Sequence, residues 1–194
     1  FNNTEWGSGA VHLFTFSDLD FNTPTLVSTI GYEYAGINDF NTNVRGEGFG
    51  YSVSLDGTRL AVGSESGANF AKDTYSIGTV SLFSFDDIVF SNPVLEATLG
   101  AGYTGGKNLD LSGVLGRPDK FGSSVSLDGL RLVVGAAIDK GFNDIYSGGS
   151  ETHSGPGAVH LITFSDLEFN GASHVGTIGE GYIGSNDLDL SILL

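Results

Sequence analysis

Short runs of apolar and alternating residues, separated by glycine and aspartate, follow one another along the whole chain. Residues 52–55 and 59–62 are two such runs, with Asp56-Gly57 between them. An Asp-Gly pair between β-prone runs is the strongest short-range hairpin signal, because a type I′ turn needs positive φ at both central positions. Residues 11–16 and 26–30 indicate two further strands. Since no stretch keeps a helical period, the pattern predicts an all-β protein with few helices.

Two sequence blocks alternate along the chain. Gly-x-Val-x-Leu-x-x-Phe begins at Gly9, Gly78 and Gly157, and each copy is followed by a segment with a glycine three residues before a tyrosine. Phe-Gly-x-Ser-Val-Ser-Leu-Asp-Gly-x-Arg-Leu-x-Val-Gly begins at Phe49 and Phe121. Self-similarity at a fixed spacing is the signature of a repeat architecture. We therefore expect a unit of about 70 residues built from two hairpins, that is, four short antiparallel strands.

The strand at residues 11–16 carries apolar side chains on both faces, Val11 and Leu13 on one and Phe14 and Phe16 on the other. Such a strand is buried on both sides of its sheet. A four-stranded unit packed between copies of itself is the architecture of a β-propeller blade. The interblade space is expected to be filled by Phe49 and Phe121, each followed by a glycine.

The repeats divide the chain into three parts. Residues 1–47 would form the second half of a blade plus a linker, and residues 48–119 and 120–194 one blade each. Propellers close with 4–8 blades, so two full repeats and a leading half predict an incomplete propeller or an open array. The pattern is already under way at Phe1, as expected for a stretch of a longer chain.

The Phe-Gly block, followed by Gly-Ala-Val-x-Leu-Phe-x-Phe, resembles the FG-GAP repeat of integrin-α-like propellers, in the form found in large bacterial surface proteins. The resemblance covers nearly the whole chain and implies a propeller-like fold and a surface-exposed, adhesin-like protein. Integrin-type blades commonly carry an Asp-x-Asp-x-Asp-Gly calcium loop between the first two strands. Here that loop is shortened to Asp56-Gly57 and Asp128-Gly129, which removes the familiar calcium site.

An acidic pattern recurs at one position after each repeated tyrosine. Side chains two residues apart in an extended segment point the same way, so each pair could offer two oxygen ligands to Ca²⁺, which takes 6–8 oxygens. The alternative is that Asp and Asn cap turns by bonding their own backbone. The sequence leaves both interpretations open. The candidate calcium ligands are Asp39, Asn41, Asn108, Asp110, Asp187 and Asp189.

The histidines carry little metal-binding signal. His12 and His160 occupy equivalent strand positions, but the third equivalent is Ser81, so we expect packed or edge histidines without a shared metal. His153 lies in the longest loop, where the irregular spacing of the acidic residues argues against zinc. Those acidic residues are Asp139, Asp144 and Glu151. The sequence contains no G-x-S-x-G elbow, P-loop or H-E-x-x-H motif, so we predict no catalytic residues and no enzyme activity.

The composition of the chain excludes several classes of binding partner and of stabilising site. The chain has 8 Lys+Arg against 23 Asp+Glu, a formal net charge of −15. Nucleic acids and anionic membrane surfaces attract basic proteins, so neither is an expected partner. The apolar runs are too short to insert into a membrane. With no cysteine, disulfide scaffolds and thiolate metal sites are excluded. The acidity and the abundance of Gly, Ser, Asn and Asp favour an extracellular or cell-surface location.

Together these patterns predict a structural or adhesive repeat protein that serves as a surface or filament scaffold. Its partners would be flanking blades or other copies of itself, with a glycan or surface protein bound through the loops. Trp6, Tyr75 and Tyr146 lie in equivalent loops, where they could stack on sugar rings or pack over their own loops. The alternatives are a glycan-active propeller enzyme, either a hydrolase or a lyase, and a glycan-binding lectin-like module.

Overall fold

The structure is a computed structural model that describes residues 7–42, 47–142 and 155–192. Within these ranges the chain forms strands and loops and contains no helix, which confirms the all-β prediction. It follows that none of the described segments is a helix able to cross a membrane.

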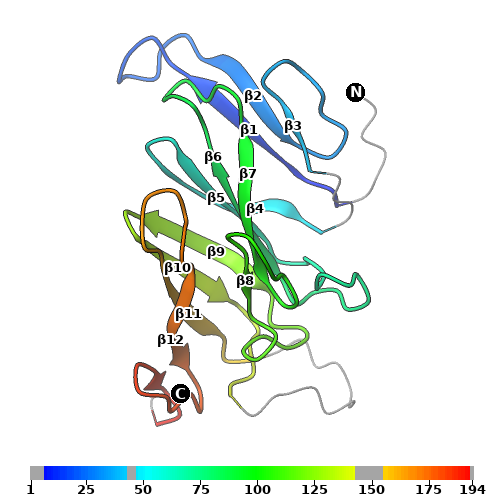
Figure 1. The fold of residues 1–194 in the computed structure, drawn as a ribbon, viewed down its shortest axis with the longest axis vertical. Helices are drawn as coiled ribbons and strands as arrows, with labels where there is room; N and C mark the ends of the chain where they lie inside the picture. The colour runs from blue at the N-terminus through cyan, green and yellow to red at the C-terminus, as the bar shows by residue number, and fades with distance from the viewer. Residues whose placement is uncertain (1–6, 43–46, 143–154, 193–194) are drawn as a thin grey trace.

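Three sheets follow one another along the long axis of the molecule, and each is built from one continuous stretch of chain (Figure 1). The first sheet contains β1 (Ala10–Thr15), β2 (Thr25–Gly31) and β3 (Phe40–Asn41). The middle sheet contains β4 (Phe49–Asp56), β5 (Arg59–Ser64), β6 (Thr79–Ser84), β7 (Val94–Gly100) and β8 (Leu109–Asp110). The last sheet contains β9 (Phe121–Asp128), β10 (Arg131–Ala136), β11 (Ala158–Thr163), β12 (Ser173–Gly179) and β13 (Leu188–Asp189).

The middle and last sheets share one topology. Their first four strands pair in chain order and antiparallel, and a short fifth strand pairs parallel with the fourth. The first sheet contains the counterparts of the last three strands, with β3 parallel to β2. The sequence predicted four strands per repeat and missed the fifth. Strands β3, β8 and β13 have two residues each, too few to show an alternating pattern.

The predicted hairpin between β4 and β5 is present, but its turn differs from the prediction. Asp56 pairs with Arg59, so the two central residues are Gly57 and Thr58. Of these, only Gly57 has a positive φ, at 60°. This is the pattern of a type II′ turn, in which glycine takes the first central position, so the type I′ assignment is wrong. The reason is that Asp56 is the last strand residue and uses its carboxylate to contact Arg59 and the next sheet.

The middle sheet is buried on both faces. Val80 and Leu82 of β6 belong to a core shared with the last sheet, whereas Phe83 and the following Phe85 belong to a core shared with the first sheet. Alternate side chains of one strand therefore enter two different cores, as its apolar pattern predicted.

Glycines permit the close approach of consecutive sheets. A Cβ atom on Gly78, just before β6, would lie 2.0 Å from the carbonyl oxygen of Phe121, the first residue of β9. One residue later, Gly122 has a φ of 89° at a register shift in β9, and its own Cβ would lie 2.6 Å from the Thr79 oxygen. The Phe-Gly block thus marks the point where the backbones of two sheets touch, which a side chain would prevent.

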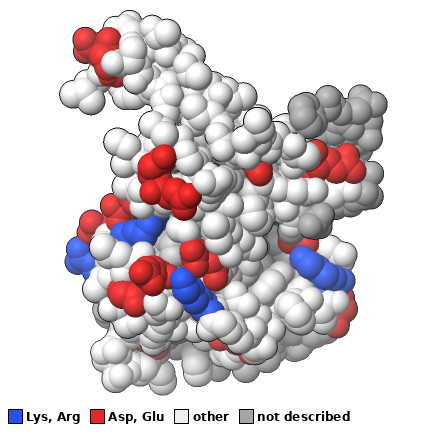
Figure 2. All heavy atoms as spheres, turned by 45° about the horizontal axis from the view of Figure 1, so that its top comes forward, with Lys and Arg blue, Asp and Glu red and all other residues white. Residues whose placement is uncertain are grey.

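Within the described part of the chain, no second sheet packs on the outer face of the first sheet. Phe14 and Phe16 are 44% and 41% exposed, whereas Phe83, the counterpart of Phe14 in the middle sheet, is 1% exposed. The prediction that the strand at residues 11–16 is buried on both faces is therefore wrong for this face, because no sister sheet packs on it within the described residues. Acidic side chains are scattered over the face shown in Figure 2, and basic ones occupy only a few places on it.

Candidate functional site

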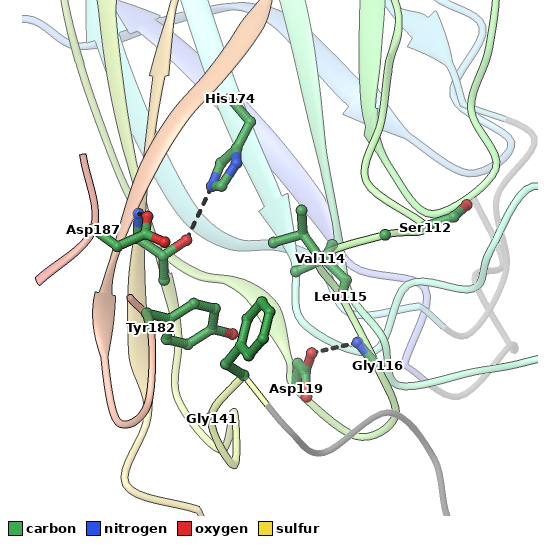
Figure 3. Close-up of a pocket in the computed structure, with 12 residues that line it drawn as sticks. Ser112, Val114, Leu115, Gly116, Asp119, Gly141, His174, Tyr182 and Asp187 are labelled. Carbon is green, nitrogen blue, oxygen red and sulfur yellow. Dashed lines mark hydrogen bonds between the residues drawn. The ribbon is translucent and has the colours of Figure 1, made fainter. Parts of the chain in front are cut away.

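A pocket of about 300 Å³ lies between the middle and last sheets. One wall is the segment that follows β8, which includes Val114 and Leu115. The opposite wall comes from β12 and from the loop after β10, and Figure 3 shows both sets of side chains around one space. The lining residues beyond these two are Ser112, Gly113, Gly116, Asp119, Gly141, Phe142, His174, Thr177, Tyr182 and Asp187.

A buried carboxylate and a phenol form a hydrogen bond beside this pocket. The Tyr182 hydroxyl donates a hydrogen bond to Asp139 Oδ2 at 2.9 Å, and both residues are buried. Burial, followed by the charge of Asp139, raises the pKa of Tyr182, so the phenol keeps its proton. Burial alone would raise the pKa of Asp139, but His160, the Gly141 N–H and the Tyr182 hydroxyl outweigh it and lower that pKa. Asp139 is therefore a buried anion with its own hydrogen-bond donors.

Two histidines continue this network along the last sheet. His160 is fully buried; its Nε2 lies 3.6 Å from Asp139 Oδ2, too far for a hydrogen bond, and its Nδ1 lies 3.2 Å from Thr177 Oγ1. His174 Nε2 lies 3.0 Å from the same Thr177 oxygen. Burial and the neighbouring His160 lower the pKa of His174. His174 is therefore neutral at pH 7 and lines the pocket as a polar but uncharged ring (Figure 3).

An equivalent pocket, of about 310 Å³, lies between the first and middle sheets. Tyr103 occupies the place of Tyr182 and packs edge-on against Phe70, at 5.5 Å between ring centroids. Here the buried anion is Glu47, whose Oε1 accepts a hydrogen bond from Lys72 Nζ at 2.6 Å. The pocket is thus a repeated feature of the junction between sheets, and the charged groups inside it vary from one junction to the next.

The six predicted calcium ligands lie on or beside the short fifth strands, and each pair closes one loop. The first members, Asp39, Asn108 and Asp187, accept hydrogen bonds from the backbone N–H groups of Thr29, Thr98 and Thr177 at 2.7, 2.8 and 2.7 Å. The second members, Asn41, Asp110 and Asp189, accept hydrogen bonds from the N–H groups of Glu33, Gly102 and Gly181 at 3.2, 2.7 and 2.8 Å.

These hydrogen bonds show what the repeated Asp/Asn pattern does in the fold. The two members of a pair bind amides on different parts of the loop, which ties the fifth strand to the turn that carries the tyrosine. The Ser191 hydroxyl, together with backbone N–H groups, lowers the pKa of Asp189. Among the described residues, no group of three or more His, Cys, Asp or Glu side chains is arranged to hold a metal ion. Calcium binding at these loops remains a prediction.

Some predicted residues lie outside the described residues, namely His153, Asp144, Glu151, Trp6 and Tyr146. Tyr75 is described and is 51% exposed, so its ring is accessible. His12 lies 3.1 Å from Thr29 Oγ1 through its Nδ1, the counterpart of the contact between His160 and Thr177.

Sequence reasoning missed the buried acids at the sheet junctions. Glu47 and Asp119 each stand two residues before a Phe-Gly pair, and both are buried. That repeated position was a signal that the sequence contained. Asp139, in contrast, has a glycine, Gly67, at the matching place of the preceding repeat, so no repeated signal could have identified it.

No protein-family model matches this sequence, and no curated protein is significantly similar to it.

Proposed function

We propose that the protein is an extracellular or cell-surface repeat scaffold in which each sheet is one blade of a β-propeller-like array. The observation that carries this proposal is the middle sheet, which is packed on both faces against sheets of the same kind. A sheet of this type needs a sister unit on either side to bury its apolar residues. The repeated Phe-Gly hairpins and their resemblance to FG-GAP repeats support the same assignment.

In this role the protein binds its partners through loops that a rigid scaffold holds in place, and it catalyses no reaction. The stacked sheets hold their loops in fixed positions, and loops on a rigid scaffold commonly carry recognition residues. The exposed ring of Tyr75 offers such a loop contact to a glycan or to a surface protein. Flanking blades or other copies of the chain are the partners that would extend the array, in a surface layer or a filament.

Calcium is the cofactor that we propose for the loops containing the Asp/Asn pairs. Hydrogen bonds to backbone amides already account for the loop conformations, so the ion would add stability to loops that form without it. The melting temperature with and without a chelator tests this role. A calcium site predicts a lower melting temperature after chelation, because a ligand that binds only the folded state stabilises it. An unchanged melting temperature would overturn the calcium proposal.

The scaffold function is tested by comparing binding with turnover. The fluorescently labelled chain is applied to a glycan array and to intact cells, and the same glycans are incubated with the unlabelled chain and analysed by chromatography. We expect retention without new products. Shortened or unsaturated sugars among the products would instead support the alternative, a glycan hydrolase or lyase. Retention confined to one glycan class, without turnover, would narrow the scaffold to a lectin-like module.

A further inference from the structure

The junction between the middle and last sheets is held by side chains that bind the backbone of the next sheet. Four residues of the β4–β5 hairpin make these contacts, and all are directed at the β9 edge or at the turn that follows it. The pairs are Ser52 Oγ to the Gly122 oxygen at 2.8 Å, the Leu127 N–H to Ser54 Oγ at 2.9 Å, the Gly129 N–H to Asp56 Oδ2 at 3.0 Å, and Arg59 Nη1 to the Gly129 oxygen at 2.8 Å.

These contacts provide hydrogen-bond partners for backbone groups that an edge strand leaves unpaired. β9 is the edge strand of its sheet, so half of its backbone N–H and C=O groups point away from β10. Such groups need partners when they are buried. The Ser-x-Ser-x-Asp-Gly-x-Arg sequence of the β4–β5 hairpin supplies partners for two of these groups, the Gly122 oxygen and the Leu127 N–H, and for both backbone groups of Gly129 in the turn that follows. β9 lies against both strands of that hairpin.

β4 is the equivalent edge strand of the middle sheet. Its outward row, that is, the side chains of Tyr51, Val53 and Leu55, is exposed to solvent. Tyr51, Val53 and Leu55 are 59%, 52% and 50% exposed. Their counterparts on β9 face the middle sheet, where Val125 packs against the core and Leu127 is buried. The same kind of strand is therefore covered in the last sheet and uncovered in the middle sheet.

β1 is open on the side where a covering hairpin would pair. In the two larger sheets, β6 pairs with β5 and β11 pairs with β10 along this edge. Within the described part of the chain, β1 pairs with β2 alone. The junction around this gap has the same geometry as the complete one. A Cβ on Gly9 would meet the Phe49 oxygen at 1.9 Å, just as a Cβ on Gly78 would meet the Phe121 oxygen at 2.0 Å.

We propose that the free edge of β1 and the outward row of β4 form a docking site for a β-hairpin from a flanking repeat unit, with the sequence type Ser-x-Ser-x-Asp-Gly-x-Arg. This inference rests on the proposed scaffold function and names the partner surface within it. The second strand of the hairpin pairs with β1, as β5 pairs with β6. Its serines, aspartate and arginine bind backbone groups of Gly50, Leu55 and Gly57, the counterparts of Gly122, Leu127 and Gly129.

The observations favour this occupant over an arbitrary apolar partner because both halves of the site have a template in the same molecule. The incoming hairpin has six register pairs available along β1, the number formed between β5 and β6. It also places four side chains on β4 at positions already used on β9. The chain carries two hairpins of this type, at residues 49–64 and 121–136.

The first experiment adds a synthetic peptide of residues 121–136 to the full chain. Hydrogen exchange of β1 and β4 is followed by mass spectrometry, and affinity is measured by calorimetry. We expect slower exchange in both strands. A control peptide with Asp128→Ala and Arg131→Ala keeps the strand pattern but loses two of the backbone contacts, and we expect it to bind at least about tenfold more weakly. Equal binding of both peptides would overturn the side-chain part of the proposal.

Because an isolated hairpin is only marginally stable, a second variant joins residues 47–77 directly ahead of Gly9, so that the added hairpin precedes β1 as β4–β5 precedes β6. We expect the melting temperature to rise by about 5 °C or more and the exchange of β1 and β4 to slow together. If this fusion fails to give a β-sheet spectrum by circular dichroism, the peptide experiment alone tests the docking site.

Two results would overturn the docking site. One is that neither the peptide nor the folded fusion protects β1 and β4. The other is a concentration-dependent dimer in which β1 alone is protected, because that result assigns the edge to a second copy paired strand to strand. Neither result bears on glycan retention or turnover, so the docking site and the scaffold function fail separately.

Discussion

Replacing Arg59 with alanine tests how strongly one sheet is held to the next, and Arg131 provides a matched control in the same molecule. The two arginines occupy the same position in the two Phe-Gly hairpins. The Arg59 side chain is 8% exposed and donates a hydrogen bond to the Gly129 oxygen of the last sheet. The Arg131 side chain is 72% exposed and contacts Asp128 of its own hairpin.

The structure allows the two losses to be estimated. A hydrogen bond from a charged group contributes about 1.5–3 kcal/mol to stability. The Arg59 guanidinium also lies 5.4 Å from the centroid of the Phe169 ring, and a partly buried cation–π contact adds about 1 kcal/mol. We therefore expect Arg59→Ala to lower the free energy of unfolding by about 2–4 kcal/mol. Arg131→Ala removes an exposed ion pair, for which about 0.5 kcal/mol or less is expected.

Urea unfolding followed by both circular dichroism and tyrosine fluorescence measures the two variants. Two probes are needed because stacked repeats can unfold stepwise, and the free energy is read only where the transitions coincide. The melting temperature of Arg59→Ala should fall by about 5–15 °C for a chain of this length. Equal losses for the two variants, or a larger loss for Arg131→Ala, would show that the hairpin side chains do not hold the sheets together.

Further predictions concern the close backbone contact at Gly78 and the half-buried His174. We expect Gly78→Ala to lower the free energy of unfolding by about 3 kcal/mol or more, because its Cβ would overlap the Phe121 oxygen. The control Gly106→Ala should lower it by about 1 kcal/mol, since Gly106 has a positive φ but open space around it. Similar losses for the two variants in urea unfolding would contradict the close approach of the two backbones at Gly78. The folded state lowers the pKa of His174, so its neutral form stabilises the protein above the unfolded value of 6.5 and this stability is lost as pH falls below it. Unfolding measured from pH 7.5 to 5 should therefore show declining stability, and His174→Gln should flatten the decline; an unchanged slope in that variant would assign the decline to other groups.

Much of the fold could be predicted from local sequence. The Asp-Gly turns located both hairpins, and the repeated blocks located the strands that follow them, because short β-prone runs bounded by turn residues are local signals. The fifth strands β3, β8 and β13 could not be predicted in this way. Each has two residues and exists only because a preceding strand offers its edge for parallel pairing.

The site was less accessible to sequence reasoning. The pattern of Asp187 and Asp189 was visible, but whether the two side chains face an ion or the backbone depends on where the loop amides lie. The pocket combines β12, the loop after β10 and the segment after β8, which are far apart in the sequence. The contact between Asp139 and Tyr182 joins two of these elements, and Asp139 has no acidic counterpart in the preceding repeat.

The sequence alone determined the β class, the repeat and the apolar residues on both faces of the central strands, because each of these follows from side-chain spacing of two and from local turn chemistry. Tertiary structure decided which of those faces is buried. Phe83 and Phe14 occupy the same position in their repeats, yet one is enclosed and the other is half exposed. Burial is a property of the neighbouring sheet and not of the strand, so only the stacking of sheets could distinguish the two.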